Sequence, residues 1–61
     1  MSALGIAAED PHLLIVDDDE RLRELLQRFL SANGYRVSAA ADAAGARALM
    51  KSMAFDLLIL D

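Results

Sequence analysis

The sequence lacks several features that would point to particular classes of protein. Its 61 residues contain no cysteine, so neither a disulfide nor a thiolate metal site can form. No apolar run is long enough to span a membrane, and residues 1–8 are too short and lack the basic region of a signal peptide. The net charge of −4 argues against direct contact with nucleic acid. We therefore expect a cytoplasmic chain whose partners are neither nucleic acid nor membrane.

Apolar residues, in contrast, are abundant for so small a chain. They make up 56% of the sequence, although a chain of about 60 residues buries only about 60% of its unfolded surface. A chain of this length forms at most one small domain. We therefore expect part of a larger domain, or a subunit that needs a partner to cover its apolar surface.

The first half of the sequence predicts a flexible leader, a strand and a helix. Residues 1–11 show no sustained hydrophobic period, and Pro11 fixes an extended entry into the next segment. The aliphatic run at residues 12–16 is typical of a strand buried on both faces. After it, apolar side chains recur at helical spacing and form one stripe, made of Leu22, Leu25, Leu26, Phe29 and Leu30. The pair Asn33-Gly34 then predicts the end of this helix.

The second half predicts a strand, a helix and a third strand. Residues 35–39 alternate between apolar and polar side chains, as at the edge of a sheet. Asp42 is the predicted N-cap of a second helix, in which we expect Met50 and Met53 to fill gaps in the core. Residues 56–60 form the third predicted strand. Strands that alternate with helices are typical of an α/β fold with a parallel sheet.

Carboxylates follow two of the predicted strands. Asp17, Asp18 and Asp19 come directly after the first strand, and Asp61 comes directly after the third. Ligands of open parallel sheets bind beyond the carboxyl ends of the strands, so we expect these side chains to converge. Close carboxylates repel one another unless a cation neutralises them, and Mg2+ prefers oxygen ligands. The alternative is a set of solvated carboxylates at a helix start and a strand end.

Three segments resemble the receiver domain of two-component response regulators. They are Leu14-Ile15-Val16-Asp17-Asp18-Asp19, Gly34-Tyr35-Arg36-Val37 and Phe55-Asp56-Leu57-Leu58-Ile59-Leu60-Asp61. The resemblance implies a flavodoxin-like, doubly wound parallel sheet, of which only the strand–helix–strand–helix–strand half is present. It also implies that residues 12–61 are a partial receiver domain.

The resemblance assigns roles to the carboxylates. Asp61 matches the phosphoacceptor, which takes a phosphoryl group from a sensor histidine kinase or a small phosphodonor. Asp17 and Asp18 match the acidic pair that holds Mg2+ together with Asp61, with Asp18 in direct contact and Asp17 acting largely through water. Asp19 matches a variable position, where we expect a helix-start residue. The domain is thus expected to be a signalling phosphoacceptor rather than an enzyme.

The departures from the family pattern lower the expected competence of this chain. The flavodoxin-like order is 2-1-3-4-5, and only the first three strands are present here. The family's Ser or Thr after strand four and its Lys after strand five are absent. We expect incomplete phosphotransfer and self-association through the apolar edge of Leu57–Leu60. The alternatives are a self-associating fragment with a structural role only, and an unrelated flavodoxin-like ligand-binding module. A phosphate-binding module would favour a Gly-rich or Ser/Thr-rich first loop, whereas this loop is acidic.

Overall fold

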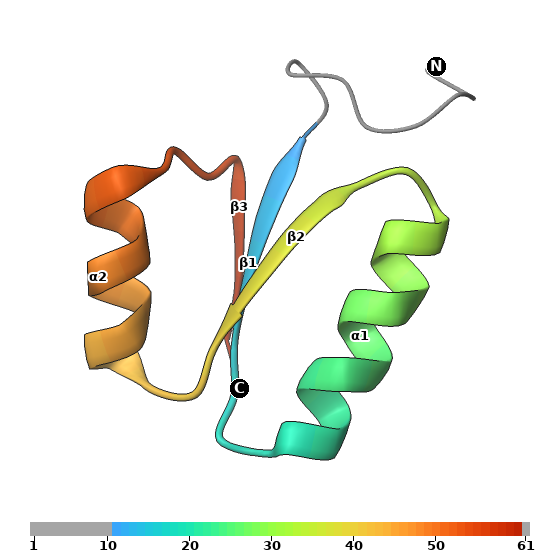
Figure 1. The fold of residues 1–61 in the computed structure, drawn as a ribbon, viewed down its shortest axis with the longest axis horizontal. Coiled ribbons are helices and arrows are strands. Elements are labelled where there is room, and N and C mark those ends of the chain that lie inside the picture. Colours follow the sequence, from blue (N-terminus) through green and yellow to red (C-terminus); the bar gives the residue numbers. More distant parts are fainter. Residues whose placement is uncertain (1–10, 61) are drawn as a thin grey trace.

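The computed structural model describes residues 11–60, which form a parallel sheet with one helix on each face (Figure 1). The elements follow the predicted order: β1 (His12–Val16), α1 (Glu20–Ala32), β2 (Arg36–Ala40), α2 (Ala43–Ser52) and β3 (Leu57–Leu60). The α/β fold with a parallel sheet is therefore confirmed. Most of the predicted leader and the predicted phosphoacceptor Asp61 lie outside the described residues.

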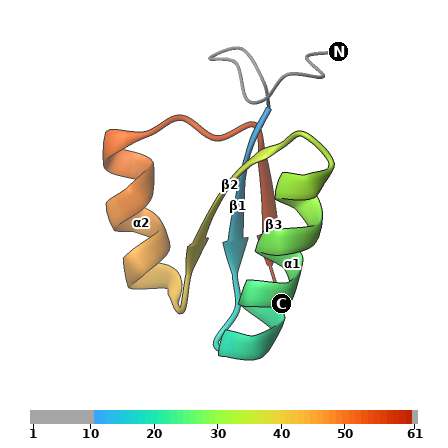
Figure 2. The same cartoon turned by 45° about the vertical axis from the view of Figure 1, so that its right-hand side comes forward.

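The strand order in the sheet is β2-β1-β3, and both pairings are parallel. All three strands therefore point in the same direction, and their carboxyl ends lie at the same end of the sheet, as their arrowheads show (Figure 2). The predicted edge position of β2 is confirmed, but β2 begins at Arg36 rather than Tyr35. Tyr35 instead donates its backbone N–H to the Leu30 carbonyl, which belongs to the end of α1. The third strand likewise begins one residue later than predicted, at Leu57.

Local sequence fixes both ends of α1. The Asp19 side chain caps the first turn by accepting from the backbone N–H groups of Arg21 and Leu22. At the other end, Asn33 is the C-cap, and Gly34 follows with a φ of 92°. Glycine adopts this left-handed conformation without a steric penalty, so the helix stops where the sequence predicts.

A short-range cap and a glycine also explain α2. Asp42 accepts from the backbone N–H of Gly45 at 2.8 Å, as expected of an N-cap. A Cβ atom at Gly45 would lie 3.3 Å from the Asp42 carboxylate and 3.4 Å from the Ala40 Cβ. The glycine lowers intrinsic helix stability by about 1 kcal/mol relative to alanine. It also allows the first turn of α2 to approach the end of β2 closely.

The core is small and centred on β1. Leu14 is fully buried and clusters with Ala40 and Ala46, and further apolar side chains pack against this cluster: Val16, Leu49 and Phe55. The prediction that β1 is buried on both faces is confirmed. The prediction that Met50 and Met53 are core residues is wrong, because they are 45% and 36% exposed. Met50 belongs to α2, and Met53 is its C-cap.

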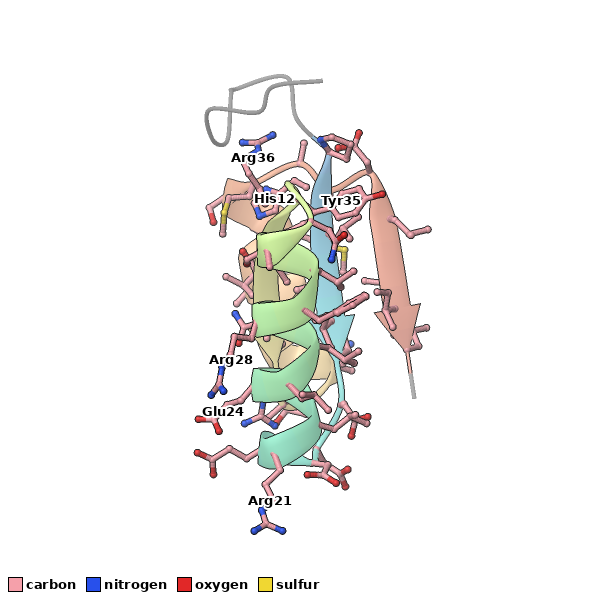
Figure 3. The ribbon with its side chains drawn as sticks, turned by 90° about the vertical axis from the view of Figure 1, so that its right-hand side faces the viewer. His12, Arg21, Glu24, Arg28, Tyr35 and Arg36 are labelled. Atoms are coloured by element: carbon pink, nitrogen blue, oxygen red, sulfur yellow. The ribbon has the colours of Figure 1, made fainter. Side chains whose placement is uncertain are left out.

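Much apolar surface is exposed at the edge of the sheet that β3 forms. Both helices pack on β1 and β2, and neither approaches β3 as closely. In the view that brings α1 to the front, β3 stands clear of the helix (Figure 3). On α1 itself, Leu25 and Phe29 are 62% and 61% exposed. The expected excess of apolar surface is thus found among the described residues. Neither of the two helices is long and apolar enough to cross a bilayer.

Candidate functional site

The candidate site lies where β1 ends and turns into α1. Asp17, the first residue after β1, donates its backbone N–H to the carbonyl of Ala40 at 3.1 Å. This bond continues the pairing of β1 with β2 by one residue, so the backbone of Asp17 is fixed by the sheet. Asp17 is also 7% exposed, and a carboxylate is seldom buried to this degree. Its position at the carboxyl end of the central strand was predicted from the sequence.

The Asp17 carboxylate is engaged through one oxygen. Oδ1 accepts a hydrogen bond from the backbone N–H of Asp19 at 2.9 Å, which closes a short turn in the loop. Within residues 11–60, no buried side-chain oxygen or nitrogen lacks a partner. The second oxygen of Asp17 is therefore not stranded in the apolar core. An oxygen of this kind suits a hard cation such as Mg2+.

Arg23 is a site residue that sequence reasoning missed. Its guanidinium reaches back from α1 and donates to the backbone carbonyl of Asp17 at 2.7 Å. The contact ties the loop to the helix and places a positive charge beside the acidic residues, which offsets part of their mutual repulsion. The available signal was its position four residues after the N-cap Asp19, on the turn of α1 that faces the loop.

The two other carboxylates of the loop have separate roles. Asp19 caps α1, accepting from Arg21 at 3.0 Å and from Leu22 at 3.2 Å, so its expected role at the helix start is confirmed. Asp18 lies between Asp17 and this cap and is exposed to solvent. Asp18 is thus exposed, whereas Asp17 is buried and the carboxylate of Asp19 is occupied in capping α1.

The third predicted carboxylate, Asp61, lies outside the described residues. The last described pair of the β1–β3 ladder is Val16 with Leu60. Asp17 and Asp61 are the next residues in their respective segments, which is the basis for expecting them to converge. Within residues 11–60 alone, no group of three His, Cys, Asp or Glu side chains is placed to hold a metal ion. The predicted set of Asp17, Asp18 and Asp61 therefore stays a prediction.

The single histidine lies at the amino-terminal end of the central strand, away from the acidic loop. His12 begins β1, is 9% exposed, and its Nε2 lies 2.9 Å from the Ser38 hydroxyl (Figure 3). Its ring also packs against Phe55, with the centroids 4.3 Å apart and the planes tilted by 54°. These contacts give His12 a structural role, and the length of β1 separates it from the acidic loop.

A shallow, open depression lies on the polar surface of α1. It is lined by Glu24, Gln27, Arg28 and Ser31. Glu24 and Arg28 project on the side of the helix away from β3 (Figure 3). The depression brings together no pair of carboxylates, so the loop after β1 remains the candidate site.

Comparison with known proteins matches residues 13–61 to a family described as the response regulator receiver domain. Among curated proteins, the chain is 57% identical over 56 residues to Protein PetR of Rhodobacter capsulatus. It is 44% identical over 50 residues to the probable transcriptional regulator ycf27 of Cyanidium caldarium. It is also 38% identical over 50 residues to the TorCAD operon transcriptional regulatory protein TorR of Escherichia coli.

These similarities cover most of this chain but little of each relative. They span 92%, 82% and 82% of this chain, and 24%, 20% and 22% of PetR, ycf27 and TorR. The chain therefore corresponds to about a quarter or less of the length of these relatives. No solved structure matches the chain.

Proposed function

Because the chain belongs to the response regulator receiver domain family, we propose that it is a phosphoacceptor of a bacterial two-component pathway. In this proposal Asp61 receives a phosphoryl group from a sensor histidine kinase, and Asp17, Asp18 and Asp61 hold Mg2+. Residues 12–61 are the receiver portion, and residues 1–11 precede it as a leader.

The observation that supports this proposal is the position of Asp17 at the end of the central strand. Its backbone is held by Ala40 and its carbonyl by Arg23, so its carboxylate is presented from a fixed loop. The β1–β3 pairing runs to Val16 and Leu60, which are the residues before Asp17 and Asp61. The oxygen-only donor set of three carboxylates suits Mg2+ and excludes metals that require thiolate.

The proposed chemistry is a phosphoryl transfer between side chains. An oxygen of Asp61 forms a bond to phosphorus as the bond from phosphorus to the kinase imidazole nitrogen breaks, and that nitrogen then takes up a proton. The product on this chain is an acyl phosphate. Mg2+, when bound, supplies charge neutralisation between the carboxylates and the phosphoryl oxygens. Asp17 and Asp18 position that charge, and Arg23 holds the loop that carries them.

The experiment that tests the proposal is intact mass measurement after incubation with a small-molecule phosphodonor, with and without Mg2+. We expect one phosphoryl adduct that requires Mg2+ and is absent in Asp61→Asn. Asp17→Asn and Asp18→Asn should each slow its formation. Asp19→Asn is the matched control, because asparagine caps a helix as well as aspartate does, so adduct formation should be unchanged.

Two outcomes would contradict the proposal. One is the absence of an adduct in the parent chain at saturating Mg2+ and phosphodonor. The other is an adduct that persists in Asp61→Asn, which would place the modification on another residue. An equal loss of adduct formation in Asp19→Asn and in Asp18→Asn would show that phosphorylation depends on the total negative charge of the loop. It would then not depend on the specific pair Asp17 and Asp18.

The relatives suggest the context in which such a domain works. Two of them are named as transcriptional regulators, so we propose that this receiver segment regulates an output carried elsewhere. With a net charge of −4, the segment itself is not expected to contact DNA or an anionic membrane surface. With a sensor histidine kinase as the proposed partner, we also propose a cytoplasmic location.

A second function, self-association without phosphotransfer, is favoured by the exposure of β3. Leu57, Leu58 and Leu60 are 56%, 40% and 65% exposed, and the strand carries no charged side chain. An uncharged strand with an open edge pairs readily with another strand. We propose that the 61-residue polypeptide on its own pairs with a second copy through β3, which a native mass measurement tests.

A further inference from the structure

The aliphatic side chains of β1 and β3 specify the register between the two strands only weakly. Leu13-Leu14-Ile15-Val16 pairs with Leu57-Leu58-Ile59-Leu60, so every position joins one aliphatic residue to another. Sliding one strand along the other by a residue would still place aliphatic beside aliphatic at three of these four positions. Register is weakly specified when the pattern does not distinguish the two faces of a strand. Neither helix approaches β3 closely enough to hold it in place.

A polar contact at the start of the two strands does distinguish the registers. Asp56 precedes β3, and its carboxylate Oδ2 accepts from the backbone N–H of His12 at 2.8 Å. In return, the backbone N–H of Asp56 donates to the carbonyl of His12, also at 2.8 Å. One residue thus makes two hydrogen bonds to the first residue of β1. Only one of the possible registers can form this reciprocal pair.

His12 is itself held firmly, so it provides a fixed reference point. Its ring is bonded to Ser38 on β2 and packed against Phe55, the residue before Asp56. The side chain is buried, with 9% exposure. The contact between His12 and Asp56 therefore joins β3 to the paired strands β1 and β2. It does so at a residue whose own position is fixed by other contacts.

We propose that Asp56 is a positioning residue that sets the β1–β3 register and thereby places Asp61 beside Asp17 and Asp18. A slip of one residue moves a strand by about 3.3 Å and turns its side chains to the opposite face. Such a slip would carry Asp61 away from the acidic pair although all three carboxylates were still present. The inference deepens the proposed function, and its part about phosphotransfer rests on that function.

The test compares Asp56→Asn with Asp56→Leu in the 61-residue chain. Asparagine keeps an oxygen acceptor, whereas leucine has a similar size and has none. Asp42→Ala is the matched control, because it removes another side-chain hydrogen bond of 2.8 Å to a backbone N–H, far from β3. The first measurement is by NMR: the scalar coupling across the hydrogen bond from the His12 amide to the Asp56 carboxyl carbon, and cross-strand NOEs between Val16 and Leu60.

We expect the coupling in the parent chain and the Val16–Leu60 NOEs in the parent, Asp56→Asn and Asp42→Ala chains. In Asp56→Leu these NOEs should weaken or be replaced by those of a shifted register. The second measurement is the rate of acyl phosphate formation on Asp61. Misplacing a reacting group by about 1 Å can cost on the order of 100-fold in rate, so we expect a loss of at least that size in Asp56→Leu only.

The register measurement separates this inference from the proposed function. Unchanged Val16–Leu60 NOEs in Asp56→Leu, or no coupling in the parent chain, would overturn the inference whatever the phosphorylation result. A shifted register in Asp56→Leu, with no phosphorylation of the parent chain, would support the inference for the fold and reject the proposed chemistry. If Asp56→Leu does not fold, two other results decide the inference. A scalar coupling in the parent chain together with an unchanged register in Asp56→Asn supports it. The absence of either result overturns it.

Discussion

The strands β1 and β3 have nearly the same aliphatic composition but opposite environments. β1 has its first four residues buried, whereas three of the four residues of β3 are exposed. The difference arises from position: β1 is central in the sheet and has a helix over each face, and β3 is an edge that neither helix covers. The hydrophobicity of a strand's sequence therefore indicates how much apolar surface the strand could bury. The position of the strand in the sheet determines how much of that surface is buried. Aliphatic side chains stabilise the core in β1, whereas in β3 the same kinds of side chain lie exposed at the edge of the sheet.

The largest expected effect comes from a pair of leucines that are partners in the β1–β3 register. Leu14 is 0% exposed and its partner Leu58 is 40% exposed. We expect Leu14→Ala to lower the free energy of unfolding by about 2–5 kcal/mol because it leaves a cavity in the core. Leu58→Ala should cost about 1 kcal/mol or less, since less surface is withdrawn from water.

Urea unfolding at low protein concentration measures both substitutions. Small domains have only about 5–15 kcal/mol of stability. The effect of Leu14→Ala is therefore read either as a lower urea midpoint or as complete unfolding without urea. Equal losses for the two variants would show that β3 is as buried as β1 in solution, and the contrast between the strands would then be incorrect.

The next effect concerns association through the exposed edge. Leu60 is 65% exposed, and lysine at an edge strand opposes pairing with another strand. We expect Leu60→Lys to shift the native mass from a dimer toward a monomer without unfolding the chain. Leu25→Lys is the control, because Leu25 is 62% exposed but lies on α1 rather than at the sheet edge.

Native mass spectrometry across a concentration series distinguishes the outcomes. A dimer that survives in Leu60→Lys but dissociates in Leu25→Lys would move the interface from β3 to the open apolar stripe of α1. A parent chain that is monomeric at every concentration would reject self-association altogether.

The smallest effect tests whether β3 opens independently of the rest of the fold. Asp42 caps α2, the helix that packs on β1 and β2. Asp42→Ala should cost about 1 kcal/mol, which corresponds to about fivefold faster amide exchange in β1 if those amides exchange through global opening. Amides of β3 should exchange by local opening and remain unaffected. Asp42→Asn, which retains a capping oxygen, should change neither strand.

Hydrogen exchange followed by NMR gives both rates in one experiment. A uniform fivefold change in β1 and β3 would mean that the three strands open as one unit. In that case the contrast between the strands is one of exposure alone and not of stability.

The sequence by itself determined the local structure. The apolar spacing, the caps Asp19 and Asp42, and Gly34 predict elements that agree with the structure to within a residue or two, because each signal acts within a few positions along the chain. The resemblance to receiver domains, carried by the acidic run and by the segment ending at Asp61, was confirmed by the family match. It could be recognised early because carboxylates at strand ends need no long-range information to be noticed.

Only the tertiary structure decided which apolar residues are buried and which distant polar groups meet. Met50 and Phe29 have the spacing of core residues, yet they are exposed because no described element covers them. Two contacts join separate elements of the fold. Arg23 binds the Asp17 carbonyl, and Asp56 binds the His12 amide across 44 positions of the chain. Such contacts depend on the order of strands in the sheet and on their register. A one-dimensional pattern of aliphatic residues leaves that register open, and folding settles it through a few directional hydrogen bonds.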